Sequence, residues 1–121
     1  MSGILLDDAT LEHLRARYPR YQESAYLFIL SALHHVLAKL EEPRHISGRE
    51  LTFGVRDLAL ERFGPLARTV LEHWGVRSTT DVGALVFALV ECGILIKQDE
   101  DRPEDFRDVF DFDQAFETDP V

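Results

Sequence analysis

Residues 80–91 read Thr-Asp-Val-Gly-Ala-Leu-Val-Phe-Ala-Leu-Val-Glu, and this stretch decides how the rest of the chain must be arranged. Residues 82–90 are all apolar, so a helix over them is apolar around its whole circumference. Such a helix either lies at the centre of a core or presents one face to a partner. A chain of 121 residues is large enough to enclose one helix. We therefore expect the central position, with a self-associating surface as the alternative.

The composition suits one folded domain. The chain is 45% hydrophobic and 29% charged, which at this length favours a single core. Its uncharged stretches are shorter than the ~20 apolar residues that span a bilayer, and no basic segment of a secretory signal begins the chain. The single cysteine, Cys92, cannot form an intramolecular disulfide. We expect a cytoplasmic protein without a membrane partner.

Helical periodicity and capping signals predict four more helices before residue 80. Ser47 and Glu50 have the spacing of a capping box, in which each side chain hydrogen-bonds the backbone amide of the other. Gly64 followed by Pro65 is typical of one helix ending and another beginning. The four predicted helices run from Asp7 or Asp8 to Pro19, from Gln22 to Glu41, from Ser47 to Gly64 and from Pro65 to Gly75.

From residue 94 the pattern changes from helix to strand. Residues 94–96 are Ile-Leu-Ile, and Phe106, Phe110 and Phe112 share one strand parity beyond a polar loop that contains Pro103. These runs predict an antiparallel hairpin. The fold class is then mainly α with a C-terminal antiparallel β-hairpin, a winged-helix-like α+β single domain. Within residues 1–121 we expect an N-terminal helix and basic-aromatic segment (1–21), a helical core (22–93) and an acidic hairpin and tail (94–121).

Negative charge gathers in the C-terminal part of the chain. The net charge is −9, and from Lys97 onward ten acidic residues stand against three basic ones. An acidic surface repels phosphate, which disfavours nucleic acid and anionic lipid as partners. The helix over residues 80–91 would hold the recognition position of a winged helix, yet it has no Arg, Lys, Asn or Gln for base contacts. The simplest alternative for the acidic residues is a solvated, solubilising surface.

We interpret the chain as a non-enzymatic protein-interaction module whose acidic hairpin docks a partner with a basic surface. Carboxylates would set encounter and orientation, and any exposed phenylalanine would supply affinity. If the phenylalanine rings of this segment are all buried, the docking surface lacks an aromatic anchor. Arginines near the N-terminus would contact the acidic hairpin within one chain or between copies, which allows a homo-oligomer. The expected partner-binding residues are Asp99, Asp101, Asp105, Phe106, Asp108, Phe110, Arg15, Arg17 and Arg20.

The alternative function is a nucleic-acid-binding winged-helix regulator. Basic and aromatic residues alternate around Pro19, and aromatic rings with neighbouring guanidinium groups can hold single-stranded RNA by stacking. Such a protein would use a cationic face remote from the acidic tail. That face would comprise Arg15, Arg17, Arg20, Arg44, Arg49 and Arg56.

No residue pattern indicates catalysis, a metal site or a cofactor. Cys92 follows Glu91 at a helix C-terminus, where the dipole and the carboxylate both oppose a thiolate. His34 and His35 point roughly 100° apart on a helix and cannot share one tetrahedral ion, which leaves a site with His45 or His73 as the alternative. The acidic loop lacks the glycine and the bidentate glutamate of an EF-hand. We expect no enzyme activity.

Five short motifs occur along the chain in a combination that is specific. They are His-Ile-Ser-Gly-Arg-Glu-Leu at 45–51, Phe-Gly-Pro at 63–65, Val-Leu-Glu-His-Trp-Gly at 70–75, Asp-Phe at 105–106 and Asp-Phe at 111–112. With these motifs the sequence resembles the Minf family of small uncharacterised bacterial proteins, over most of the chain from about Tyr26 to Phe116. The resemblance implies a bacterial origin and a single domain, and it brings no established activity or catalytic residues.

Overall fold

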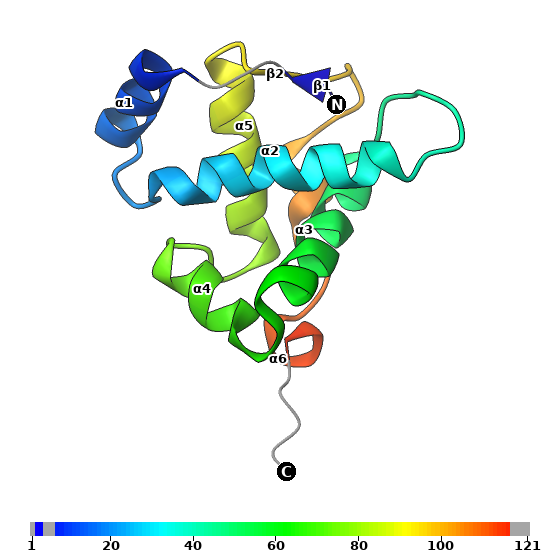
Figure 1. The fold of residues 1–121 in the computed structure, drawn as a ribbon. Coiled ribbons are helices and arrows are strands. Elements are labelled where there is room, and N and C mark those ends of the chain that lie inside the picture. The colour runs from blue at the N-terminus through cyan, green and yellow to red at the C-terminus, as the bar shows by residue number, and fades with distance from the viewer. Residues whose placement is uncertain (1, 4–6, 117–121) are drawn as a thin grey trace.

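Helices account for most of the computed structural model, which describes residues 2–3 and 7–116 (Figure 1). In chain order the elements are β1 (Ser2–Gly3), α1 (Asp8–Arg17), α2 (Glu23–Ala38), α3 (Gly48–Phe63), η1 (Gly64–Leu66), α4 (Ala67–His73), α5 (Thr79–Glu91), β2 (Leu95–Ile96), η2 (Pro103–Phe106) and α6 (Phe112–Ala115). The two η elements are 3₁₀-helices. The chain is thus a mainly helical single domain.

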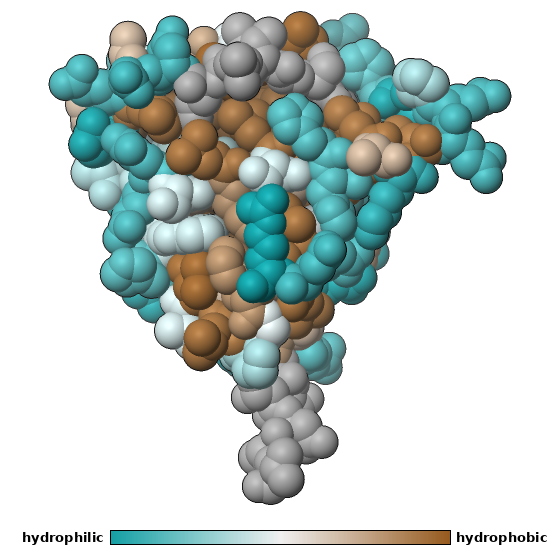
Figure 2. Space-filling view, in the orientation of Figure 1, coloured by the Kyte–Doolittle hydropathy of each residue, from teal (hydrophilic) through white to brown (hydrophobic). Residues whose placement is uncertain are grey.

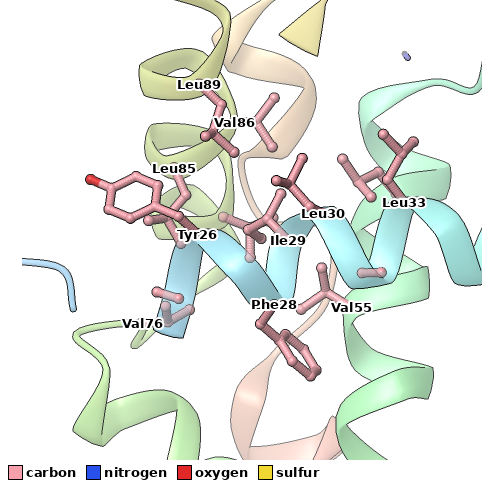
Figure 3. Close-up of a cluster of buried hydrophobic side chains, with 14 of the residues drawn as sticks. Tyr26, Phe28, Ile29, Leu30, Leu33, Val55, Val76, Leu85, Val86 and Leu89 are labelled. Carbon is pink, nitrogen blue, oxygen red and sulfur yellow. The ribbon is translucent and has the colours of Figure 1, made fainter. Parts of the chain in front are cut away.

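The apolar helix α5 lies at the centre, as its sequence predicts. It contacts α2, α3, β2 and η2. In Figure 1, α2 crosses in front of α5. Figure 2 shows the outer surface of this side, with polar groups around the edge and apolar groups across the middle. Figure 3 shows the interior, where Leu85 and Leu89 of α5 lie near Ile29 and Leu30 of α2, all of them buried.

Local capping signals place the helix ends. The Asp7 carboxylate accepts a hydrogen bond from the Thr10 amide at 2.8 Å and caps α1. The capping box of α3 is confirmed, with the Glu50 amide donating to the Ser47 hydroxyl and the Ser47 amide donating to the Glu50 carboxylate. Two helices differ in extent from their predictions. Helix α2 ends at Ala38 rather than near Glu41, and the helix predicted from Pro65 is divided into η1 and α4.

The predicted C-terminal hairpin is wrong, and the described residues contain no wing. Strand β2 forms, but its antiparallel partner is β1, with Ile96 opposite Ser2 and Leu95 opposite Gly3. The predicted second strand is instead η2, a loop and α6. Two local features prevent a continuous strand over residues 102–112. The Asp105 carboxylate accepts a hydrogen bond from the Arg102 amide, which closes a turn. Asp108 has a left-handed backbone conformation with φ 51°.

The side chain of Phe106 fixes the C-terminal segment to the helices. It is fully buried, and its ring meets that of Phe87 edge-on at a centroid distance of 5.9 Å. A Cβ atom on Gly48 of α3 would lie 2.5 Å from the Phe106 ring, and one on Gly83 of α5 would lie 2.7 Å from its Cβ. Glycine at these two positions therefore makes the space that the side chain fills.

Few large apolar side chains remain exposed. Among the described residues these are Leu27, Leu60, Leu66 and Ile96. The helices in the described part of the chain are too short or too polar to cross a bilayer.

Two buried tyrosines of the core differ in how their hydroxyl groups are satisfied. The Tyr21 hydroxyl donates a 2.6 Å hydrogen bond to the Asp81 carboxylate, whereas the Tyr26 hydroxyl is buried without a hydrogen-bond partner. Burial, with smaller contributions from Tyr18 and Cys92, raises the pKa of Tyr26 to about 12. Burial of the Tyr26 ring therefore stabilises the core, whereas burial of its unpaired hydroxyl oxygen destabilises the fold.

We expect opposite effects from replacing these tyrosines with phenylalanine. Tyr26→Phe removes an unpaired buried oxygen, so the free energy of unfolding should stay unchanged or rise by up to about 1 kcal/mol. Tyr21→Phe removes a hydrogen bond to a carboxylate, so the same quantity should fall by about 1–3 kcal/mol. Urea denaturation measures both values. A greater loss for Tyr26→Phe than for Tyr21→Phe would contradict this assignment.

Candidate protein-docking site

The acidic residues predicted to face a partner divide into two groups. Asp99, Asp105 and Asp108 are exposed. Asp101 is buried, and its carboxylate accepts a 2.8 Å hydrogen bond from the Gln98 amide. Asp101 thus shapes the turn between β2 and η2, while the exposed carboxylates are available to a partner.

The phenylalanines of the segment mostly serve its own core. Phe106, Phe112 and Phe116 are buried. Phe110 is half-buried, lies almost parallel to Phe112 at 5.7 Å and contacts the Phe53 ring of α3 at 5.9 Å. Of the two rings predicted to bind a partner, Phe106 is therefore inaccessible and Phe110 keeps accessible surface.

The N-terminal arginines do not contact the acidic segment within the chain, so the intrachain form of the predicted contact is wrong. Arg15 pairs with Glu23 at 3.0 Å, and Arg17 pairs with Glu91 at 3.1 Å. Arg20 pairs at 3.2 Å with the buried Asp81. These carboxylates belong to α2 and α5, so the three ion pairs hold the helices together and do not neutralise the C-terminal carboxylates.

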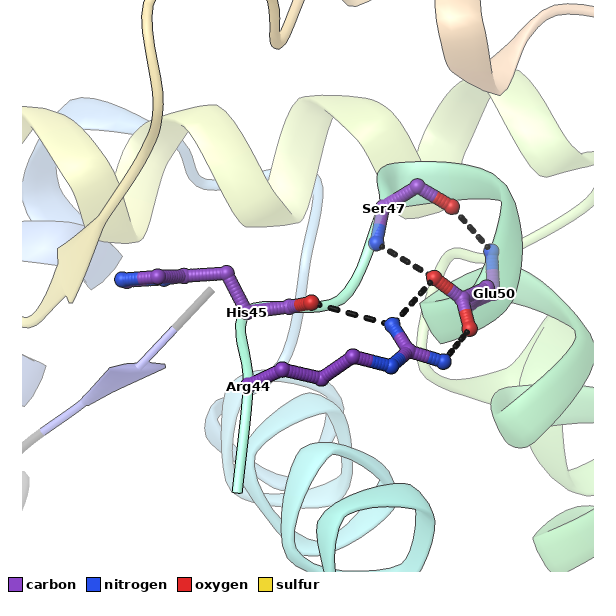
Figure 4. Close-up of polar contacts among 4 residues, drawn as sticks. All are labelled: Arg44, His45, Ser47 and Glu50. Carbon is purple, nitrogen blue, oxygen red and sulfur yellow. Dashed lines mark hydrogen bonds and ion pairs between the residues drawn. The ribbon is translucent and has the colours of Figure 1, made fainter. Parts of the chain in front are cut away.

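The other arginines of the predicted cationic face are also occupied. Figure 4 shows Arg44 beside the capping box of α3, where its guanidinium donates two hydrogen bonds to Glu50, the shorter at 2.7 Å. These bonds, together with the one from the Ser47 amide, lower the pKa of Glu50 to about 2. Arg56 pairs with Asp57 at 2.9 Å, and Arg49 lies over the Phe53 ring at 5.2 Å.

An open pocket lies beside Phe110 and has a volume of about 340 Å³. We call it the Phe110 pocket. It is lined by Arg68, Arg77, Ser78, Asp108, Phe110, Asp111, Phe112 and Asp113. The pocket therefore joins α4, the loop before α5 and the acidic segment.

The three carboxylates of the Phe110 pocket differ in their partners. Asp113 pairs with Arg68, and Asp111 accepts a 2.8 Å hydrogen bond from the Asp113 amide at the start of α6. Asp108 has no hydrogen-bond or ion-pair partner among the described residues, and its left-handed backbone is a conformation that aspartate tolerates better than most residues. A free carboxylate beside an aromatic ring suits a guanidinium or ammonium group.

No sequence pattern predicts the basic part of this pocket. Arg68 and Arg77 lie far from the acidic segment along the chain, and no motif connects them to it. The sequence marks Ser78 only as a candidate cap of α5, and nothing in it marks Phe53 as a neighbour of Phe110. Composition and aromatic spacing predicted Asp108 and Phe110 as partner-binding residues, but not that Asp111 and Asp113 line one pocket with them.

Two features of the described residues bear on catalytic chemistry, the Cys92 thiol and the grouping of possible metal ligands. Burial, aided by the neighbouring Glu91, raises the pKa of the Cys92 thiol, which makes the reactive thiolate scarcer. Within residues 2–3 and 7–116, no three His, Cys, Asp or Glu side chains come together in a group that could hold a metal ion.

No family model matches the chain, and searches of curated proteins and of solved structures give no significant match. The resemblance to the Minf family therefore stays a prediction.

The capping box predicts an acid-sensitive contribution to stability. The pKa of Glu50 falls from its ordinary 4.5 to about 2 on folding, so its ionised form stabilises the fold above about pH 4.5. This contribution is lost as the pH falls from 4.5 through 2. Glu50→Gln should therefore lose less stability than the wild type between about pH 6 and pH 3.

Urea denaturation at several pH values measures this difference. Glu12→Gln is a matched control, because Glu12 is exposed on α1 and makes no hydrogen bond or ion pair with a described residue. The control should follow the wild-type pH profile. A Glu50→Gln profile parallel to the wild type would contradict the role of Glu50.

Proposed function

We propose that this chain is a non-enzymatic protein-interaction module that docks a partner with a basic surface through the Phe110 pocket. The observation that carries the proposal is Asp108, a free carboxylate at the rim of a pocket whose wall is the Phe110 ring. An arginine of the partner would pair with Asp108 and contact the accessible part of Phe110, a ring over which Arg56 already lies at 6.0 Å. The unpaired cysteine supports a cytoplasmic location for such a module.

The rigid attachment of the acidic segment supports this role. Phe106 is buried at the start of the segment, and Phe112 and Phe116 are buried toward its end. Between them the Val109 amide donates a 3.2 Å hydrogen bond to the Thr79 hydroxyl. A segment ordered before it meets its partner loses less conformational entropy on binding than a flexible tail.

The ion pairs disfavour the nucleic-acid-binding alternative. Nucleic acid gains affinity when free cations replace counterions on its phosphates. Five of the six arginines on the predicted face, all except Arg49, already pair with a carboxylate. Moving them to phosphates would leave those carboxylates facing the nucleic acid.

Binding of a labelled eight-residue peptide that alternates arginine and glycine, measured by fluorescence anisotropy, tests the proposal. Asp108→Asn should weaken binding about two- to fivefold, because it removes one exposed charge pair. Asparagine suits the left-handed backbone at this position, so the fold should persist. Asp8→Asn is the matched control, since Asp8 is exposed on α1 and the change in net charge is identical.

Backbone amide shifts during the titration should locate the peptide at residues 107–113. Equal weakening by Asp8→Asn and Asp108→Asn would contradict the proposal, because it would mean that only net charge matters. Tighter binding of a short duplex or single-stranded oligonucleotide, weakening steeply with salt, would favour the alternative function.

A further inference from the structure

Three aromatic side chains meet on a face built by α2, η1 and the ends of α3 and α4. The ring centroids of Phe28 and Phe63 are 5.7 Å apart, those of Phe28 and Trp74 are 5.4 Å apart, and those of Phe63 and Trp74 are 5.7 Å apart. Phe28 is buried, whereas Phe63 and Trp74 are half-buried. Leu27, which precedes Phe28 in α2, is 45% exposed, and Leu66, three residues after Phe63, is 62% exposed.

We call these five residues the aromatic patch. Figure 2 shows apolar groups interspersed with polar ones on the surface below α2. Leu27 and Leu66 are two of the four large apolar side chains that are exposed among the described residues. Exposed aromatic and leucine side chains in one area are typical of an interaction surface.

Two charges of opposite sign, at positions 61 and 62, directly precede Phe63 on the last turn of α3. The Arg62 guanidinium lies over the Phe28 ring at 5.9 Å and pairs with no carboxylate among the described residues. The neighbouring Glu61 side chain is 66% exposed, and its one ionic contact is with His35 at 3.8 Å. The patch thus carries one free cation and one carboxylate that is only weakly engaged.

We propose that the aromatic patch is the interface of a homodimer, covered by a second copy of this chain across a two-fold axis. In such an interface, every contact occurs twice. If one residue of the first copy contacts another residue of the second copy, the same two residues also meet with the copies exchanged. A patch with one positive and one negative residue side by side is complementary to itself. Arg62 of each copy then meets Glu61 of the other.

Burial of the aromatic rings and leucines supplies most of the binding free energy of this dimer. Tryptophan and phenylalanine anchors carry most of the affinity of interfaces, whereas charges at the edge fix orientation. The aromatic patch shares no residue with the Phe110 pocket, so dimerisation and docking are independent of each other. Each copy in the dimer keeps its own pocket.

Sedimentation velocity from low to high micromolar concentration tests the proposal on the full chain. The wild type should shift from monomer to dimer, and Leu66→Asp should remain monomeric over the same range. Ile96→Asp is the matched control, because Ile96 on β2 is 61% exposed and lies outside the patch. It should dimerise like the wild type.

A charge exchange tests the pairing itself. Arg62→Glu and Glu61→Arg should each weaken dimerisation about tenfold, because each places like charges opposite one another. The double variant restores opposite charges and should return the dissociation constant to within about threefold of the wild type. Circular dichroism confirms that each variant is folded.

Three results would overturn the proposal: a wild-type chain that stays monomeric at every concentration, equal effects of Leu66→Asp and Ile96→Asp, or no recovery in the double charge variant.

Discussion

Placement of the Phe106 side chain between Gly48 and Gly83 is the constraint on which the C-terminal part of this structure depends. Two helices, α3 and α5, each have glycine where a larger residue would displace the side chain. Because Phe106 follows a loop rich in carboxylates, its burial draws that loop onto the helices. The negatively charged segment therefore becomes part of the folded domain, with exposed carboxylates at fixed positions.

A polar centre lies close to this packing, at Asp81 in the first turn of α5 and two residues before Gly83. The Asp81 carboxylate accepts hydrogen bonds from the Tyr21 hydroxyl and the Arg77 amide and pairs with Arg20. It fixes the segment after α1 to the start of α5. Because Arg15 and Arg17 also pair with helix carboxylates, the positive charge of this region is used internally. Much of the unpaired surface charge is therefore negative and C-terminal.

The helices could be predicted from the sequence because their signals are local. The capping residues Asp7 and Ser47 and the uninterrupted apolar run of α5 each act within a few residues, and the structure contains all three features. The hairpin could not be predicted correctly, since the even spacing of Phe106, Phe110 and Phe112 is equally compatible with burial against helices. The true partner of β2, at residues 2–3, is distant in sequence and carries no strand signal.

The candidate site was predictable in charge but not in shape. Composition identified the acidic segment, yet which ring stays accessible depends on packing that Gly48, Gly83 and Phe53 create from other helices. Amide hydrogen exchange in the native chain tests most directly whether this segment is part of the fold. Because the Val109 amide donates to the Thr79 hydroxyl and Val109 is buried, this amide should exchange as slowly as the amides of α5. Exchange at the rate of an unstructured peptide would contradict this prediction.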